Sequence, residues 1–325
     1  MNKAIQIVCV AVVVAGLCSA ARGKVNIETV PVGNPGNTAD TEVMNDGTTG
    51  YGAVAYEYNI GKYEVTAGQY TEFLNAVAGD DSNGLYASYM AGTTGGCKIS
   101  RSGSSGGYSY SVSETRSDRP VNHVSWYDAL RFANWLHNGQ PSGVQDDSTT
   151  EDGAYDMSLG AGVVRQPGAT WVLPTEDEWY KSAYYKGGGT DAGYWDYPTQ
   201  SDTVPGHNIR LGVPWDENAN YSQAIGYPLY RTVVGEFRYS DGPYGTFDQG
   251  GNVWEWNEVL VGSDRGYRGG SYKNGGLTLH AYDRNDRGPT DQSSGGGFRV
   301  AEVPEPATLI LMAAGLSSLL RRRRR

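Results

Sequence analysis

Residues 173–179 read Leu-Pro-Thr-Glu-Asp-Glu-Trp, and this stretch contains the start of a helix. Thr175 and Glu178 stand at the spacing of a capping box, in which each side chain accepts a hydrogen bond from the backbone N–H of the other residue. Pro174 fixes the entry of the chain, and Trp179 follows on the first turn. The stretch therefore predicts a capped helix that carries a tryptophan.

Two more helix starts give the same signal. Thr66 is followed by Gln69, and Ser125 by Asp128, which is a weaker member of a capping box. Apolar side chains then recur at helical spacing: Tyr70, Phe73, Leu74 and Val77 after the first start, and Ala129, Phe132, Ala133 and Leu136 after the second. Gly79 is expected to end the first of these helices.

Strand signals are short. Residues 56–60 alternate between polar and apolar side chains, and residues 171–173 and 232–234 do so more briefly. Neither a long parallel-sheet pattern nor an internal repeat is evident. The 46 glycines, 24 tyrosines and 8 tryptophans favour a loop-rich domain held together by aromatic side chains. We predict an irregular α+β fold with few helices and short strands, and an insertion near residues 140–162.

The chain begins like an exported protein. A basic start, a short apolar run and small residues at Ala20 and Ala21 describe a signal peptide over residues 1–21. A buried first helix is the alternative. Residues 22–50 then form an N-terminal lead-in to a domain over residues 51–301.

The end of the chain, residues 303–325, has three parts. Pro-Glu-Pro at 304–306 precedes an apolar segment at 307–320 and an arginine block at 321–325. The 14 apolar residues would span roughly 21 Å as a helix, short of a bilayer core of about 30 Å, but the arginines should stay on the cytoplasmic side. The tail resembles the PEP-CTERM sorting signal of Gram-negative bacteria. The resemblance implies a short transmembrane helix as a transient anchor, an exosortase-type sorting protease as partner, and release to the cell surface or extracellular matrix. A plain C-terminal membrane anchor is the alternative.

Charge and cysteine content exclude some classes of function. Without Lys3 and the terminal arginines, 20 basic residues face 36 acidic ones, so the domain should repel nucleic acid and anionic membranes. Cys9 and Cys18 lie in the signal peptide, which leaves Cys97 and no internal disulfide. Cys97 is either a tolerated small residue or a reactive or intermolecular thiol.

Six motifs in order identify a family. They are Tyr-Glu-Val-Thr at 63–66, Arg-Pro-Val-Asn-His-Val-Ser-Trp at 119–126, the stretch at 173–179, Gly-Gly-Asn-Val-Trp-Glu-Trp at 250–256, Arg-Gly-Gly-Ser-Tyr at 268–272, and Gly-Phe-Arg-Val-Ala at 297–301. Together they resemble the formylglycine-generating enzyme, or sulfatase-modifying factor, domain over residues 51–301. The resemblance implies an irregular α+β fold related to C-type lectins.

The resemblance also implies calcium sites. Asp248 and Glu255 would bind one ion through their side chains, and Gly251 and Val253 would bind it through their carbonyls. Calcium prefers such oxygen ligands. Glu255 could instead pair with Arg299 or Arg268 and bind no metal. A second site would use Asn220 and the carbonyl of Tyr221, although a carboxylate partner is not evident in the sequence near it.

The catalytic chemistry of the family is missing. Its enzymes hold copper with two active-site cysteines that follow the Arg-Gly-Gly-Ser motif, because thiolates suit copper(I). Those positions are Asn274 and Leu279 here, so neither formylglycine-generating activity nor copper is expected. The histidines at 123, 137, 207 and 280 show no close ligand spacing, although a site built around His280 is the alternative.

Three hypotheses for function follow. The first is a non-catalytic module that binds a surface polysaccharide, a peptide or a matrix component. The second is an oxidoreductase of the family with altered, non-cysteine metal chemistry, and the third is a structural matrix component. The tryptophans at 126, 179, 254 and 256 are expected in the core rather than in a sugar site. The arginines at 268, 284 and 299 are expected to be buried ion-pair or hydrogen-bond anchors.

Overall fold

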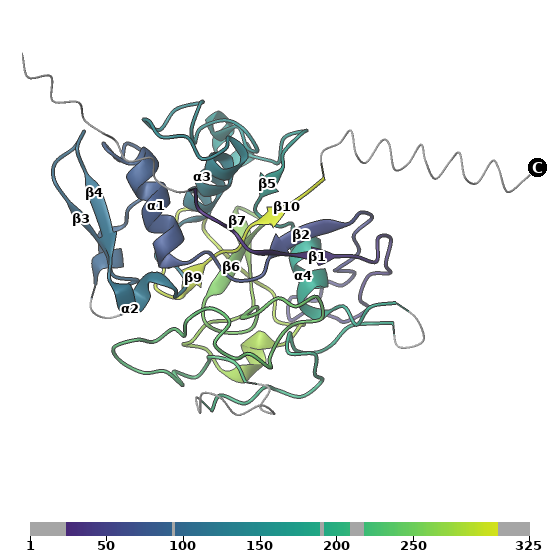
Figure 1. Cartoon of the computed structure of the whole chain (residues 1–325). Helices are drawn as coiled ribbons and strands as arrows, with labels where there is room; N and C mark the ends of the chain where they lie inside the picture. The colour runs from purple at the N-terminus through teal and green to yellow at the C-terminus, as the bar shows by residue number, and fades with distance from the viewer. Residues whose placement is uncertain (1–23, 93–94, 189–191, 209–217, 305–325) are drawn as a thin grey trace, which may run out of the picture.

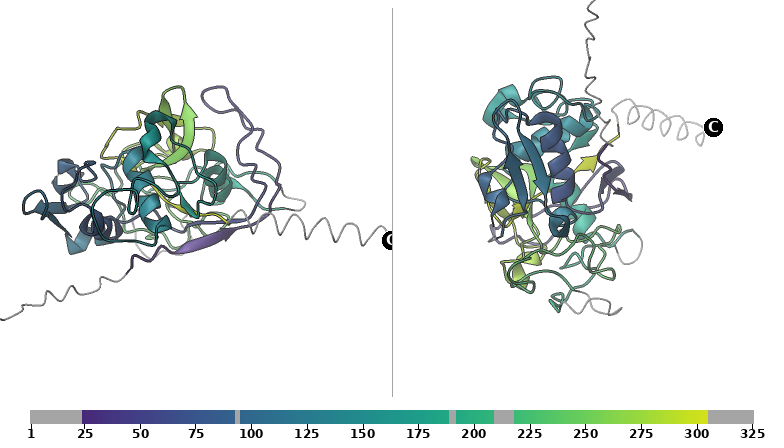
Figure 2. Two further views of the ribbon diagram at one scale, coloured as in Figure 1. Left: turned by 90° about the horizontal axis from the view of Figure 1, so that it is seen from above. Right: turned by 60° about the vertical axis from the view of Figure 1, so that its left-hand side comes forward.

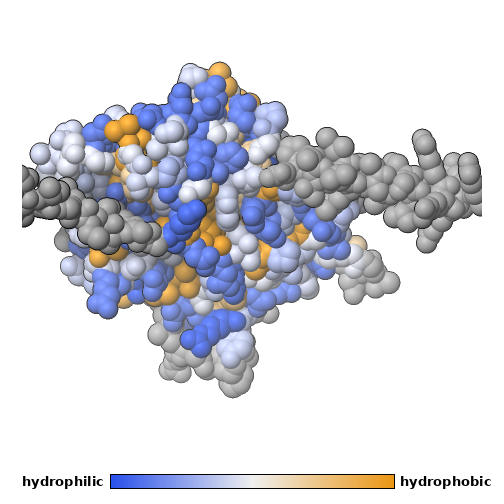
Figure 3. Space-filling view, turned by 45° about the horizontal axis from the view of Figure 1, so that its top comes forward, coloured by the Kyte–Doolittle hydropathy of each residue, from blue (hydrophilic) through white to orange (hydrophobic). Residues whose placement is uncertain are grey.

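The computed structural model describes residues 24–92, 95–188, 192–208 and 218–304 (Figure 1). The predicted signal peptide at 1–21, the apolar segment at 307–320 and the arginine block at 321–325 lie outside these residues. Among the described residues, no helix has the length and apolar character needed to cross a bilayer. The face seen in Figure 3 mixes hydrophilic and hydrophobic residues.

All three predicted helices form, and each begins with its capping box. They are α1 (Ala67–Val77), α3 (Trp126–His137) and α4 (Glu176–Tyr184). In α4, the N–H of Glu178 donates to Thr175 Oγ1 at 3.1 Å and the N–H of Thr175 donates to Glu178 Oε2 at 2.7 Å. Such caps stabilise a helix by about 1 kcal/mol each. The helix α1 ends at Val77, just before Gly79.

Short helical turns complete the helical part of the described chain. They are the α-helix α2 (Glu114–Ser117) and the 3₁₀ turns η1 (Ser88–Ala91), η2 (Met157–Gly162) and η3 (Gly276–Leu279).

Two small four-stranded sheets form the centre. One has the order β1 (Thr29–Val32), β2 (Tyr58–Gly61), β10 (Ala301–Glu302) and β5 (Trp171–Val172), with antiparallel neighbours. The other has the order β8 (Asn285–Arg287), β7 (Asp264–Arg268), β6 (Trp254–Val261) and β9 (Gly296–Gly297). The described chain therefore begins and ends in the same sheet.

A separate hairpin covers α1. It consists of β3 (Ile99–Ser102) and β4 (Ser109–Val112), and it lies in front of α1 in the right-hand view of Figure 2. Asn75 on α1 fixes it, because its side chain both donates to Tyr110 O at 2.8 Å and accepts from Tyr110 N at 2.9 Å.

The structure shows how the lead-in is used and corrects one expected strand. The lead-in at 22–50 supplies β1, which pairs with β2, so it is part of the sheet. The strand predicted at 232–234 is wrong. There the backbone N–H and the hydroxyl of Thr232 donate to Asn252 Oδ1 at 2.9 and 3.0 Å. A side-chain oxygen therefore accepts the hydrogen bond that a neighbouring strand would otherwise accept. The alternation of three residues in the sequence cannot reveal such an acceptor.

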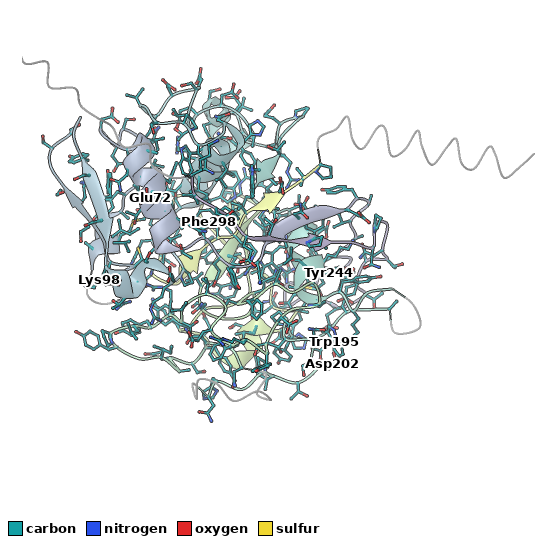
Figure 4. The ribbon with its side chains drawn as sticks, viewed as in Figure 1. Glu72, Lys98, Trp195, Asp202, Tyr244 and Phe298 are labelled. Atoms are coloured by element: carbon teal, nitrogen blue, oxygen red, sulfur yellow. The ribbon has the colours of Figure 1, made fainter. Side chains whose placement is uncertain are left out.

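The core is aromatic, as the composition predicts. Phe298, labelled in Figure 4, meets Phe132 with ring centroids 5.4 Å apart, and Phe132 meets Phe73 at 5.3 Å. Each of these side chains is fully buried, which contributes about 2–3 kcal/mol per ring, and edge-to-face pairs add about 0.5–1.5 kcal/mol. The tryptophans at 126, 179, 254 and 256 are also buried, as expected.

The insertion at 140–162 is bound to α3. Asn134 donates to the carbonyls of Thr150 and Tyr155, both at 2.8 Å, and Arg131 forms a two-point pair with Glu151 at 2.8 Å. These contacts order a segment that is otherwise rich in turns.

Candidate functional site

A buried ion pair lies at the centre of the molecule. Glu255 on β6 accepts from Arg299 Nε at 2.6 Å and from Arg299 Nη2 at 2.7 Å, and neither side chain has exposed surface. Trp179 Nε1 on α4 donates to the same carboxylate at 2.7 Å. Glu255 therefore pairs with Arg299, which is one of the two alternatives that the sequence left open.

Glu64 is another acidic side chain in this region, and the sequence analysis did not single it out. It is 1% exposed, and neither of its carboxylate oxygens has a hydrogen-bond partner. Burial raises the pKa of Glu64 well above its usual range, and the charges of Asp248 and Glu255 raise it further. Its signal in the sequence was an acidic residue between Tyr63 and Val65 in the first motif.

Asp248 completes this acidic cluster, which comprises Glu64, Asp248 and Glu255. Its Oδ2 accepts from the N–H of Gly235 at 2.6 Å, and its φ of +61° lies in the left-handed region. Burial raises the pKa of Asp248 to about 6. The backbone conformation and the hydrogen bond hold the carboxylate within electrostatic range of Glu64.

The acidic cluster fits calcium in part. Calcium prefers oxygen ligands, and Glu64 offers two oxygens that lack partners. Glu255 fits less well, because Arg299 and Trp179 already occupy its oxygens. Within the described ranges, no three His, Cys, Asp or Glu side chains converge closely enough to hold a metal ion.

At the second predicted calcium position, Asn220 is used as a structural donor. Its Nδ2 donates to Tyr230 O at 2.9 Å and to Asn252 Oδ1 at 2.8 Å, while its Oδ1 is buried without a partner. The hydroxyl of Tyr221 donates to Pro205 O at 2.6 Å. The contacts of Asn220 therefore include a carbonyl and an amide but no carboxylate.

The two positions where the resemblance places cysteines have structural roles. Asn274 Oδ1 accepts from Trp254 Nε1 at 2.9 Å and from Ser271 Oγ at 2.6 Å. Leu279 is fully buried and packs with Tyr197, Ala219 and Tyr221. Neither position supplies a thiolate.

Cys97 is a buried free thiol. It is 1% exposed, its Sγ lies 3.9 Å from Asn122 O, and burial raises its pKa. These observations favour the tolerated small residue over the reactive thiol.

A hollow of about 590 Å³ lies beside η3, and we call it the η3 hollow. It is lined by Asp196, Tyr197, Asp202, Thr203, Val204, Tyr221, Gly276, Leu277, His280 and Tyr282. Three of these residues belong to the segment between Asn274 and Tyr282, although neither Asn274 nor Leu279 is part of the lining. Leu277 and Val204 form an apolar rim, with 64% and 44% of their surface exposed.

The charged side chains that line the η3 hollow include two carboxylates, Asp196 and Asp202. Asp196 Oδ2 lies 3.5 Å from His280 Nε2, and the ring of His280 lies 4.5 Å from that of Tyr282. Asp202 pairs with Lys186 at 3.3 Å, and the ammonium group of Lys186 lies 4.1 Å from the ring centroid of Trp195. Asp202 and Trp195 are labelled in Figure 4. The hollow thus presents carboxylates and hydroxyls beside aromatic and apolar surface.

Several other buried charges form ion pairs within the domain. Arg268 and Arg284 both bind Glu176, at 2.8 and 2.9 Å, which confirms their expected anchoring role. Arg165 binds Glu178 and Glu258 at 2.8 and 2.9 Å. These pairs connect α4 to the second sheet and do not line the η3 hollow.

Two family profiles match the chain. The one described as the sulfatase-modifying factor enzyme 1-like domain matches residues 27–303. The one described as the PEP-CTERM protein-sorting motif matches residues 302–325. Both resemblances seen in the sequence are confirmed. The sorting motif implies export and membrane-associated sorting by an exosortase-type system.

The chain is similar to several solved structures, and the first of those named here shares its fold. Treponema denticola variable protein 1 is 21% identical, with a TM-score of 0.54 and coverage of 87% of this chain and 97% of that one. CarF is 22% identical, with a TM-score of 0.47 and coverage of 86% and 99%. PvdO from Pseudomonas aeruginosa is 19% identical, with a TM-score of 0.48 and coverage of 86% and 92%. The comparison with curated proteins found no significant match.

Proposed function

This chain belongs to the sulfatase-modifying factor enzyme 1-like family, and we propose that it is a non-catalytic binding module at the cell surface or in the extracellular matrix. The observation that carries the proposal is the η3 hollow. It offers carboxylates, hydroxyls and aromatic rings beside η3, while Asn274 and Leu279, where the resemblance places cysteines, serve hydrogen bonding and packing. A hollow whose neighbouring segment carries no thiols supports binding rather than oxidation.

The ligand that suits the hollow is a surface polysaccharide. Carboxylates such as Asp196 and Asp202 accept hydrogen bonds from sugar hydroxyls, and the half-buried ring of Tyr282 offers an apolar face to a sugar ring. The acidic lining opposes a polyanion, so the polysaccharide should be neutral. A binding screen could instead identify a peptide as the ligand.

Binding can be tested by blocking the hollow. Leu277→Arg places a long charged side chain at an exposed position of η3 and should abolish binding without loss of stability. Leu159→Arg is the matched control, because Leu159 is an exposed leucine in η2, within the insertion. The measurement is retention of the purified mature protein on neutral polysaccharides and on a peptide array. Equal binding by the two variants would exclude the η3 hollow as the site.

Metal analysis of the same preparation tests the competing hypothesis. Stoichiometric copper or iron would contradict the non-catalytic proposal and favour the altered oxidoreductase. If the wild-type protein binds neither polysaccharide nor peptide, the hypothesis of a structural matrix component remains.

We also propose that calcium stabilises the domain at the acidic cluster, with Glu64 as a ligand beside Asp248, Glu255 and the carbonyls of Gly251 and Val253. The three carboxylates do not converge closely enough in this structure, so binding would require their side chains to move together around the ion. The two oxygens of Glu64 that lack partners support this proposal. The ion would offset the mutual repulsion of the three carboxylates, and Arg299 would have to release part of its contact with Glu255.

A further inference from the structure

The last strand of the domain lies inside a sheet rather than at its edge. In β10, Ala301 pairs with Ile60 of β2 on one side and with Val172 of β5 on the other. The N–H of Val303 then donates to Thr170 O at 2.8 Å, and Asn59 Nδ2 donates to Glu302 Oε2 at 3.1 Å. The chain is therefore held by the fold up to Val303.

The sorting motif begins at this point. Its match starts at residue 302, within β10, and Pro304 is the second residue after the end of the strand. The three residues 304–306 separate Val303 from the apolar segment at 307–320. Even fully extended, the path from Val303 to Ala307 spans only roughly 14 Å. An enzyme that reads residues 304–306 must therefore come within contact distance of the folded domain.

Peeling β10 away from the sheet would be costly. The residues that lead into it, Phe298, Arg299 and Val300, are fully buried, and Arg299 holds Glu255. Pulling these residues out would leave the Glu255 carboxylate buried without its cation and would expose large apolar side chains to water, and both changes are unfavourable. The sorting enzyme should therefore meet the chain with β10 in place.

A hollow of about 640 Å³ lies at the end of β10, and we call it the β10 hollow. Its lining comes from β1, β2, the residue before β5 and the end of β10: Pro31, Val32, Gly33, Glu57, Tyr58, Asn59, Thr170, Glu302, Val303 and Pro304. Pro304 of the motif is itself part of the wall. The charged residues among these are Glu57 and Glu302, so the hollow is acidic.

We propose that the β10 hollow is the surface on which the membrane sorting enzyme docks while it engages Pro304 and the residues that follow. The short connection forces the contact, and the hollow offers a concave surface at that point. Its acidity calls for a basic or hydrogen-bond-donating face on the enzyme. While the tail is anchored, this face of the domain points toward the membrane. Because the sheet holds the chain up to Val303, the enzyme cuts only after that residue.

Processing of the full chain in cells that contain the sorting enzyme tests the proposal. Glu57 is exposed and lies within the electrostatic range of Lys181. Glu57→Lys should slow conversion to the tail-less protein about three- to tenfold, and Glu57→Gln should slow it less. The matched control is Glu72→Lys, because Glu72 is an exposed glutamate on α1, outside the β10 hollow (Figure 4). Thermal unfolding of each variant checks that the fold is kept.

A spacer separates docking from other effects. Six Gly and Ser residues inserted between Val303 and Pro304 should let the enzyme reach the motif without touching the hollow, so the effect of Glu57→Lys should vanish. The proposal is overturned if Glu57→Lys is processed like the wild type, if Glu72→Lys is slowed equally, or if the effect of Glu57→Lys survives the spacer. A mature C-terminus before Val303, or a wild-type tail that is never removed, overturns it as well.

Discussion

Glu255 and Arg299 face each other across the centre of the domain in a two-point ion pair, and neither side chain has exposed surface. Arg299 also donates to the carbonyls of Gly61 and Phe247, both at 2.8 Å. The pair thus ties β6 to the chain beside β2 and to the segment before β10. Its geometry makes it specific, although desolvation of the two charges offsets much of their attraction.

Removing one partner of this pair should destabilise the domain strongly. Arg299→Met leaves the Glu255 carboxylate buried without its cation and should lower the free energy of unfolding by about 3–5 kcal/mol. Urea denaturation measures the loss. Arg287→Met is the control, because Arg287 pairs with Asp291 at the exposed surface and should change stability by less than about 1 kcal/mol. Similar losses in both variants would contradict the assigned role.

Glu64→Gln should separate the calcium proposal from simple burial. The amide keeps the shape of the side chain without a charge, so in chelator the variant should be at least as stable as the wild type. Added calcium should raise the unfolding temperature of the wild type and leave that of the variant unchanged. A calcium response of equal size in both proteins would rule out Glu64 as a ligand, and no response in either would rule out calcium at the acidic cluster.

Asn274→Ala should show that Asn274, where the resemblance places a cysteine, serves stability. The substitution leaves the indole N–H of Trp254 without its acceptor and should cost about 1–3 kcal/mol. Asn274→Asp keeps an oxygen at the same place and should cost less. Thermal or urea unfolding distinguishes the two. A neutral Asn274→Ala would mean that the contact with Trp254 contributes nothing.

Asp128 should give the domain a measurable pH dependence. Burial raises its pKa to about 6, against the lowering effect of hydrogen bonds from Ser125 and Gln292, whereas an unfolded aspartate titrates at about 3.9. The folded state therefore binds more protons in this window, so this group lowers the free energy of unfolding as the pH rises from about 4 to about 6.

The test compares Asp128→Asn with the wild type across that window. The asparagine retains an acceptor for the N–H of Ser125, and it removes the ionisation. Relative to the wild type, the variant should gain up to about 2–3 kcal/mol between pH 4 and pH 6.5. Asp147→Asn, at an exposed site, should show no such gain. Parallel pH curves for wild type and Asp128→Asn would contradict the raised pKa.

Local signals in the sequence predicted the helices well. Each capping box joins residues three apart, such as Thr175 and Glu178, so its signal can be seen in a short stretch of sequence. The prediction of a strand at 232–234 was wrong because the hydrogen-bond partner there is distant in the sequence. Thr232 bonds to Asn252, 20 residues away, and no local pattern could show that acceptor.

The sequence by itself determined the family, the α+β class, the three helix starts and the sorting tail, because these depend on short motifs and on residues close together in the chain. Only the tertiary structure decided that Arg299 takes up Glu255, that Glu64 lies unpartnered near Asp248, and that β10 ends beside a hollow. In each case the partners are far apart in sequence, so their contact depends on packing of the whole core rather than on local conformational preference.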